Sequence, residues 1–319
     1  PAAVESAARM LASGNLYPEG SSRVLREKIG RKFGLAPDCI IVGNGADEII
    51  YYTAMSLIND GDEVIIPACT FPIYEIAFRT MRAEIVTSSM DNLRIDLKDI
   101  LDHITGRTKI IALCNPNNPT GHALEKKDIY RFIDQVPEDV LILMDEAYMD
   151  FADRDRFPDI ISLFKKGVDN LIIVRTLSKA YGIAGFRVGY GIADPGLTGL
   201  INRIKLPFNV SIVSQAAAVG ALSDEGFLMK TIENTKEGRL TIYRAMQELG
   251  LDCVESNTNF ILIDTGRDAD EITGELMRRG VIVRSAKNYG LPGSIRVTVG
   301  SHEQNDKFIS AMRDVMQAG

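Results

Sequence analysis

We predict an α/β fold in which a mostly parallel sheet of seven strands lies between helices, followed by a small α+β C-terminal domain. Two observations lead to this prediction. Short, β-branched apolar runs recur along the first two thirds of the chain, and most are separated by stretches in which apolar residues have helical spacing. Because these runs are apolar on both faces, they are typical of strands in a parallel sheet covered by helices on each side.

The predicted elements follow one another in a regular order. A helix at 22–33 comes first, because its apolar residues recur at helical intervals, and the segment from Gly34 to Pro37 breaks it. Short apolar runs then predict the seven strands, which we place at 40–42, 63–67, 83–88, 109–114, 140–145, 170–176 and 187–193.

The pattern changes after residue 210. A long helical stretch at 211–249 is broken near Gly220 and at 224–226, and shorter elements alternate from there to the end. We place strands at 259–265, 281–284 and 294–300 and helices at 268–279 and from 302 onward. We therefore divide the chain into an N-terminal segment at 1–22, a large domain at 23–222 and a small domain at 223–319.

The composition is that of an ordinary globular protein. Of the 319 residues, 45% are hydrophobic and 25% are charged, and no apolar run approaches the roughly 20 residues that a membrane helix needs. The net charge is -7, and no basic stripe with interleaved aromatic residues could neutralise a phosphate backbone. We therefore expect neither a membrane nor a nucleic acid as a partner.

The cysteines and histidines predict neither disulfides nor a metal site. The four cysteines are scattered among apolar residues without a Cys-x-x-Cys pair, which favours free thiols in a reducing compartment, and we expect the cytoplasm. The three histidines lie too far apart for a zinc cluster. The chain begins at Pro1 without a charged and then apolar leader, so we expect no signal peptide.

Polar residues follow four of the predicted strands, where a sheet of this kind builds its ligand sites. The first group is GNGADE at 43–48, which opens a helix. The backbone N–H groups of Gly45, Ala46 and Asp47 could bind an anion there. A capped helix start without a ligand is the alternative. The group is not a dinucleotide fingerprint, because position 48 is Glu.

The second group is CNPNNPTG at 114–121. Its two prolines exclude a helix and fix a rigid turn that presents the side chains of Asn117 and Asn118 at the edge of the sheet. A plain Asn-Pro turn without a ligand is the alternative, because both residues are common in turns.

The third group is MDEAYMDF at 144–151, in which Asp145 ends an apolar run. A carboxylate at the end of a buried strand is unfavourable unless it is paired, so a bound cation or a protonated ring nitrogen is a reasonable partner. A helix cap for the following turn is the alternative.

The fourth group is RTLSKAYGIAGFRVGY at 175–190. It places Ser178, Lys179 and Arg187 on a glycine-rich turn, and two cations with a hydroxyl suit a phosphate. Lysine also forms Schiff bases with carbonyl compounds, best when burial lowers its pKa. A solvated lysine is the alternative.

Together and in this order, the four groups resemble the fold-type I, aspartate-aminotransferase-like superfamily of pyridoxal-phosphate enzymes. The resemblance covers essentially the whole chain. Within the superfamily the chain looks most like the histidinol-phosphate aminotransferases, which are also similar in LYPEGSSRVLREKIGRKFG at 16–34, PACTFPIYE at 67–75 and KLPFNVS at 205–211. The resemblance implies the fold of class I and II aminotransferases, with pyridoxal 5′-phosphate as the cofactor.

The resemblance also implies the catalytic residues, which are Lys179, Asp145 and Tyr148. Lys179 would hold the cofactor as a Schiff base and move the proton between the substrate α-carbon and the cofactor. Asp145 would keep the ring nitrogen protonated, while Asn118 and Tyr148 would donate hydrogen bonds to the phenolic oxygen of the ring.

Further residues would bind the cofactor phosphate and cover the ring. Phe71 would stack on the ring face, and Tyr74 is the less favoured choice for that position. The phosphate would be bound by Ser178, Arg187 and the backbone amides of Ala46 and Asp47. The large domain would thus be the cofactor-binding domain.

Substrate recognition is expected to come from the small domain, and a second subunit is expected to complete the cofactor site. Arg296 in SIRVTVG matches the arginine that binds the α-carboxylate. Arg284 is the candidate for a distal phosphate, with a surface arginine as the alternative, and Asn209 is a further substrate contact. Tyr17 resembles the cofactor-binding tyrosine that reaches the phosphate of the neighbouring subunit, so we expect a homodimer to which segment 1–22 contributes, beside the small domain.

The expected reaction transfers the amino group of L-histidinol phosphate to 2-oxoglutarate, giving imidazole-acetol phosphate and L-glutamate in histidine biosynthesis. A threonine-phosphate decarboxylase and an aminotransferase for aromatic or aliphatic amino acids are alternatives on the same fold. A non-catalytic pyridoxal-phosphate sensor is disfavoured, because the sequence has no fused helix-turn-helix segment. The N-terminal arm that closes over the substrate in the family would precede the first residue of this chain.

Overall fold

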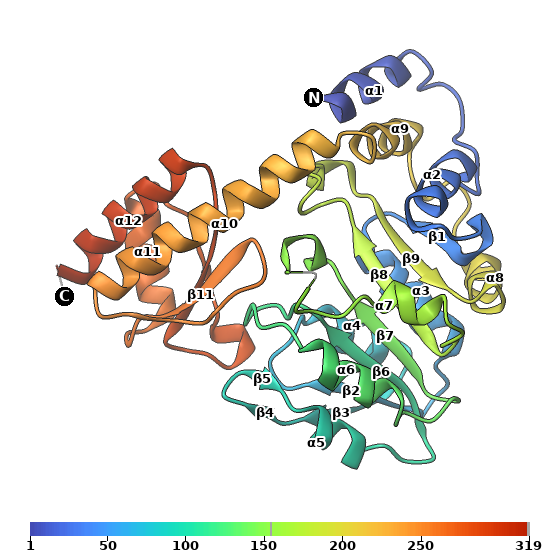
Figure 1. The fold of residues 1–319 in the computed structure, drawn as a ribbon, viewed down its shortest axis with the longest axis horizontal. Helices are drawn as coiled ribbons and strands as arrows, with labels where there is room; N and C mark the ends of the chain where they lie inside the picture. Colours follow the sequence, from blue (N-terminus) through green and yellow to red (C-terminus); the bar gives the residue numbers. More distant parts are fainter. Residues whose placement is uncertain (154, 318–319) are drawn as a thin grey trace.

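The computed structural model describes residues 1–153 and 155–317, and its largest element is a sheet of seven strands (Figure 1). In chain order these strands are β1 Ile40–Gly43, β2 Glu63–Pro67, β3 Glu84–Ser88, β6 Thr108–Cys114, β7 Leu141–Asp145, β8 Leu171–Thr176 and β9 Gly189–Ala193. Their order across the sheet is β1-β9-β8-β7-β6-β2-β3. All neighbours from β8 to β3 are parallel, whereas β9 is antiparallel to both of its neighbours. The predicted mostly parallel sheet is confirmed.

Side chains along each strand of this sheet point alternately into two apolar cores, one on each face of the sheet. Ile142 and Met144 of β7 belong to one core, whereas Leu141 and Leu143 belong to the other. The first core is covered by α2 Arg23–Phe33, α5 Leu97–Asp102, α6 Lys126–Ile133, α7 Ile160–Phe164 and α9 Ile212–Ala221. The second is covered by α3 Ala46–Leu57, α4 Ile73–Thr80 and α8 Pro195–Ile204. Burial on both faces explains why the strands are apolar throughout.

A second, smaller sheet lies in the C-terminal part of the chain. It is antiparallel, and its order is β10 Asp252–Cys253, β11 Phe260–Asp264, β13 Ser294–Thr298 and β12 Arg284–Ser285. The helices α11 Ala269–Arg278 and α12 His302–Gln317 pack on it. The predicted strand at 281–284 is therefore corrected to Arg284–Ser285, because only these two residues pair with β13.

A single long helix, α10 Glu225–Glu248, connects the two sheets (Figure 1). Leu228 near its start belongs to the first core of the large sheet, whereas Ile242 and Met246 near its end belong to the core of the small sheet. The predicted boundary between residues 222 and 223 falls just before this helix, and the division into three segments stays a prediction.

The remaining elements are short. Helix α1 Ala2–Leu11 packs along α9, and the strands β4 Met90–Asp91 and β5 Arg94–Ile95 form a hairpin. Short 3-10 helices connect larger elements; they are η1 Pro37–Cys39, η2 Met149–Phe151, η3 Ala184–Phe186 and η4 Lys287–Tyr289. The four cysteines are free thiols. Within the described ranges, no helix has both the length and the apolar character that crossing a bilayer requires.

Candidate active site

A cavity of about 330 Å³ lies between the carboxyl ends of β6, β7 and β8 and the small sheet. Its lining includes every predicted site residue except Tyr17 and Asn209. Those residues are Ala46, Asp47, Phe71, Asn118, Asp145, Tyr148, Ser178, Lys179, Arg187, Arg284 and Arg296. The fold therefore brings the four polar sequence groups and the two arginines of the small sheet to one place.

Asp145 is the buried acid of this cavity. Its side chain ends β7, and the residue is only 2% exposed. The Tyr74 hydroxyl donates to Oδ2 at 2.7 Å, and the Ala147 N–H donates to Oδ1 at 3.0 Å. Burial raises the pKa of Asp145 to about 6, although both hydrogen bonds oppose this change. A carboxylate in this position is a strong site for a cationic group.

Tyr74 has a role that the sequence did not reveal. Its ring is fully buried on α4, and its hydroxyl binds Asp145 across 71 positions of sequence. Phe71 lies one turn earlier and meets the Tyr74 ring edge to face, with 5.9 Å between the centroids. Of the two aromatic residues, Phe71 lines the cavity, whereas Tyr74 lies outside the lining and donates a hydrogen bond to Asp145.

Lys179 is the amine of the cavity. It follows β8 by three residues, in the turn that leads toward β9. Its Nζ lies 5.2 Å from the centroid of the Tyr148 ring. Burial, with a further contribution from the charge of Arg296, lowers the pKa of Lys179. A lowered pKa increases the fraction of neutral amine, which is the nucleophilic and basic form.

One part of the cavity wall is suited to an anion. The first residues of α3, Ala46 and Asp47, present backbone N–H groups at a helix N-terminus. Arg187 lies beside them, with NH1 3.3 Å from Ser178 Oγ and NH2 3.8 Å from Asp47 Oδ2. Backbone amides, a hydroxyl and a guanidinium together form a phosphate-binding arrangement.

Gly189 allows this wall to form. A Cβ atom at Gly189 would lie 2.3 Å from the backbone nitrogen of Ala46, which is far inside any possible contact. Only glycine therefore lets β9 pass close to the start of α3. This close approach brings Arg187, two residues earlier, to the helix N-terminus.

The small sheet contributes two guanidinium groups. Arg284 and Arg296 are directly opposite each other in the β12–β13 pair, so their side chains leave the sheet on the same face. Arg296 donates through NH1 to Asn118 Oδ1, and its guanidinium carbon lies 4.7 Å from the Phe260 ring centroid. The guanidinium of Arg284 lies 6.0 Å from the Tyr289 ring. Two positive charges thus face the cavity.

The two central asparagines of the CNPNNPTG loop lie in different surroundings. Asn118 lines the cavity, whereas Asn117 is held inside the protein. The Asn117 side chain accepts from Thr70 Oγ1 at 2.8 Å and donates to the carbonyl oxygen of Cys69 at 2.9 Å. Asn117 therefore attaches this loop to the segment that precedes Phe71. Both peptide bonds before the prolines, at Pro116 and Pro119, are cis.

Tyr17 and Asn209 lie outside the cavity. Tyr17 is 81% exposed, and its ring stacks on Phe208 with 4.8 Å between the centroids. The Asn209 amide donates to the Val42 carbonyl oxygen at 3.2 Å and accepts from Lys205 Nζ at 3.0 Å. The polar atoms of Asn209 thus hold the 205–209 segment against β1, and its role as a substrate contact stays a prediction.

Comparison with known families agrees with this arrangement. The sequence pattern of the family "Aminotransferase class I and II" matches residues 1–312. The chain belongs to this family. Histidinol-phosphate aminotransferase 2 from Carboxydothermus hydrogenoformans is 42% identical to this aminotransferase over 304 residues, which are 95% of the chain and 84% of the relative.

Two solved structures show how far the fold is shared. Histidinol-phosphate aminotransferase from Sinorhizobium meliloti, crystallised with pyridoxal-5′-phosphate, superposes with a TM-score of 0.94 at 28% identity and covers 100% of this chain and 87% of its own. L-threonine-O-3-phosphate decarboxylase from Porphyromonas gingivalis has a TM-score of 0.85 at 24% identity, and the match covers 99% of this chain and 95% of the decarboxylase chain. The second likeness concerns the fold alone.

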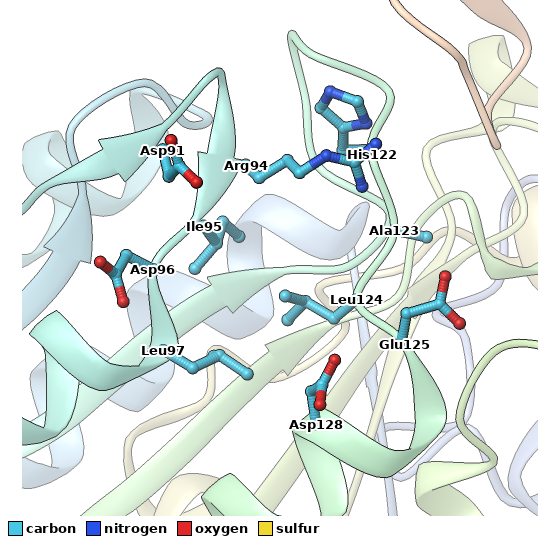
Figure 2. Close-up of a pocket in the computed structure, with 10 residues that line it drawn as sticks. All are labelled: Asp91, Arg94, Ile95, Asp96, Leu97, His122, Ala123, Leu124, Glu125 and Asp128. Carbon is cyan, nitrogen blue, oxygen red and sulfur yellow. The ribbon is translucent and has the colours of Figure 1, made fainter.

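The aminotransferase has a second cavity of about 350 Å³ beside the β4–β5 hairpin (Figure 2). Figure 2 shows Arg94 extending toward the loop that carries His122. Burial, together with the charge of Arg94, lowers the pKa of His122 to about 4. The lining contains no lysine and consists of Asp91, Arg94, Ile95, Asp96, Leu97, His122, Ala123, Leu124, Glu125 and Asp128. This cavity lacks the amine that the first one has.

Among residues 1–153 and 155–317, no group of three or more His, Cys, Asp or Glu side chains is arranged to hold a metal ion. The cationic groups of the first cavity are instead lysine and arginine side chains, which suit anionic and carbonyl compounds.

Proposed function

We propose that this aminotransferase uses pyridoxal 5′-phosphate to transfer the amino group of L-histidinol phosphate to 2-oxoglutarate, giving imidazole-acetol phosphate and L-glutamate in histidine biosynthesis. The observation that carries the proposal is the meeting of Lys179 and the buried Asp145 on one side of a cavity with Arg284 and Arg296 on the other. Relatives named histidinol-phosphate aminotransferase, at 36% to 42% identity over most of the chain, support the choice of donor.

The residues of the cavity fit the cofactor. Asp145 is a buried carboxylate whose hydrogen bonds come from neutral groups, so a protonated ring nitrogen would supply the positive charge that it lacks. When bound, pyridoxal phosphate supplies an aldehyde and an electron-withdrawing ring. Lys179 would bind the aldehyde covalently, and Phe71 would cover one face of the ring.

Other residues would orient the cofactor. Tyr148 and Asn118 lie beside Asp145 in the lining and would donate hydrogen bonds to the phenolic oxygen. The phosphate would be held by Ser178, Arg187 and the N–H groups of Ala46 and Asp47. The cofactor would thus be held at two points, with its phosphate at the start of α3 and its ring nitrogen at Asp145.

Lys179 would move the proton at the α-carbon of the substrate. Its pKa is lowered by burial, so a larger fraction of its amine than in an exposed lysine is in the neutral form that can accept a proton. Its position beside the Tyr148 ring restricts the directions from which the amine reaches the substrate. General base and nucleophile would therefore be the same side chain.

The two arginines would select anionic substrates. Arg296 would bind the α-carboxylate of glutamate or 2-oxoglutarate through its forked guanidinium. The phosphate of histidinol phosphate lies farther from the amino-bearing carbon than a carboxylate does, and Arg284 on the edge strand β12 would reach it. Asn209 remains a predicted substrate contact that the observed hydrogen bonds do not support.

The working form would be a cytoplasmic homodimer. Tyr17 and its neighbours form an exposed apolar patch, which a monomer seldom leaves uncovered. The patch consists of Leu16 at 59%, Tyr17 at 81%, Leu206 at 64% and Phe208 at 45% exposure. A second copy would cover this patch and receive Tyr17 at its cofactor phosphate. Free, mostly buried thiols fit a reducing compartment.

A substrate titration tests the proposal. The visible absorption spectrum of the cofactor-loaded protein is recorded while L-histidinol phosphate is added, with L-threonine phosphate and L-phenylalanine as comparisons. We expect histidinol phosphate to remove the visible band and 2-oxoglutarate to restore it with formation of glutamate. Carbon dioxide released from threonine phosphate would instead indicate a decarboxylase, and a preference for phenylalanine would indicate an aromatic aminotransferase.

A further inference from the structure

A row of polar side chains lies behind the site, on the other face of the large sheet. Strand pairing joins Cys114 to Asp145 and Asp145 to Val174, so the next residues, Asn115, Glu146 and Arg175, also lie side by side. Because side chains alternate between faces along a strand, Glu146 points away from the cavity into which Asp145 points. Tyr190 of β9 continues this row as the partner of Arg175.

Glu146 and Arg175 form a buried ion pair in this row. The Nε and NH2 groups of Arg175 donate to Glu146 Oε2 at 2.9 and 2.7 Å. The side chain of Glu146 is 0% exposed and that of Arg175 is 10% exposed. The guanidinium also lies 5.3 Å from the Phe33 ring of α2. In the part of the chain that the structure describes, the second oxygen of Glu146 has no hydrogen-bond partner.

A buried ion pair contributes little net stability to a core. The free energy needed to remove two charges from water nearly cancels their attraction, and apolar residues of similar volume are often as stabilising. The geometry that the pair imposes is therefore its more important property. A planar guanidinium that directs two N–H groups at one oxygen fixes both distance and direction. Here it joins the ends of β7 and β8.

We infer that Glu146 and Arg175 are positioning residues that hold Asp145 and Lys179 at a fixed separation. Glu146 directly follows Asp145, and Arg175 precedes Lys179 by four residues at the end of the neighbouring strand. The Glu146 N–H also donates to the Val174 carbonyl oxygen at 2.8 Å, which extends the strand pairing up to the ion pair. This inference rests on the proposed function, because it assigns a purpose to the separation of those two groups.

The test compares Glu146→Gln with the double variant Glu146→Met/Arg175→Met. The first leaves a buried guanidinium without its counter-charge, and the second replaces the pair with apolar side chains. Glu248→Gln is the matched control, because Glu248 forms an exposed ion pair with Arg313. For each protein we would measure kcat, KM for the amino donor, pyridoxal-phosphate affinity by absorbance, and the melting temperature of the cofactor-free form.

We expect Glu146→Gln to lower kcat about tenfold or more, with KM for the donor nearly unchanged, because a shift of about 1 Å between reacting groups has effects of this size. The double variant should regain the melting temperature of the wild type while kcat stays low. Both variants should also bind the cofactor more weakly. Glu248→Gln should match the wild type in every measurement.

Two results would overturn the inference. One is a double variant whose kcat recovers along with its melting temperature, since the pair would then only fill space. The other is a Glu146→Gln protein that melts earlier but keeps its kcat and cofactor affinity. Failure of the proposed function is recognised separately, because the wild type itself would then not act on histidinol phosphate; cofactor affinity of the variants would still test the positioning role.

Discussion

The large and the small sheet contribute different chemistry to the same cavity. The large sheet provides an amine and a carboxylate from the ends of its central strands, and Asp145 is buried with directed hydrogen bonds. The small sheet provides two guanidinium groups, one of them on β12, an edge strand of two residues. Under the proposed function, the groups that handle the cofactor would thus be held in fixed geometry, whereas one group that selects the substrate, Arg284, would lie on an edge strand.

The largest effect should come from removing the amine of the large sheet. Lys179→Ala should lower kcat by about 10⁴-fold, because nucleophile and general base are lost together. The protein should still fold, and it should lose the visible band of covalently held cofactor. The absorption spectrum and circular dichroism measure both. Lys98→Ala, at an exposed position, is the control; a visible band that persists in Lys179→Ala would assign the covalent link to another lysine.

Asp145→Asn should have the next largest effect, about 10³-fold on kcat, because a neutral amide does not hold a protonated ring nitrogen. In the cofactor-free protein, by contrast, the same substitution should increase stability. Burial raises the pKa of Asp145 from 3.8 to about 6, so its contribution to stability is present below pH 4 and is lost as the pH rises through 6.

The cofactor-free Asp145→Asn protein should therefore melt at a higher temperature than the wild type at pH 8, and the gap should narrow below pH 6. Melting curves between pH 4 and 8 measure this difference. An equal gap at all pH values would mean that the carboxyl does not titrate in this range.

Replacing an arginine of the small sheet should change substrate choice rather than cofactor binding. Arg284→Ala should lower kcat/KM for histidinol phosphate by about 10- to 100-fold, the range for a charged hydrogen bond, and spare phosphate-free amino acids. Arg296→Ala is the matched comparison and should weaken amino-acid and oxo-acid substrates alike. Equal losses on phosphorylated and phosphate-free donors in Arg284→Ala would contradict the division of roles between the two arginines.

The smallest effect should come from replacing Tyr74, the buried hydrogen-bond donor to Asp145. Tyr74→Phe removes one neutral hydrogen bond to Asp145, so kcat should fall by only about fivefold. Loss of that donor should also raise the pKa of Asp145 further above 6. The pH below which cofactor affinity declines, followed by absorbance, should move upward relative to the wild type. A midpoint that stays in place would show that Tyr74 does not tune the acid.

Most of the fold and of the cavity could be predicted because local patterns carried the information. The seven apolar runs are long enough to locate strands, and residues at the ends of parallel strands must meet at one edge of the sheet. That rule places Asp145 and Lys179 together without a structure. The separation between the two arginines and this edge depends on how the small sheet packs, and only the resemblance to a family indicated it.

What the sequence did not reveal depends on contacts between distant residues. Tyr74 reads as a buried aromatic of a helix, and nothing local shows that its hydroxyl reaches a strand 71 positions later. Arg175 ends an apolar run and could equally have faced water, so its pairing with Glu146 required the strand register. The contacts of Asn209 were hidden for the same reason, because its partners come from β1, α3 and Lys205.

The long helix α10 has a mechanical consequence. Its 24 residues span about 36 Å, with one end in the core of each sheet. A tilt of about 5° at its first turn would displace the far end by about 3 Å, which is the length of a hydrogen bond. Such a tilt would carry Arg284 and Arg296 with the small sheet and change their distance from Lys179. The direction of α10 therefore determines the width of the cavity.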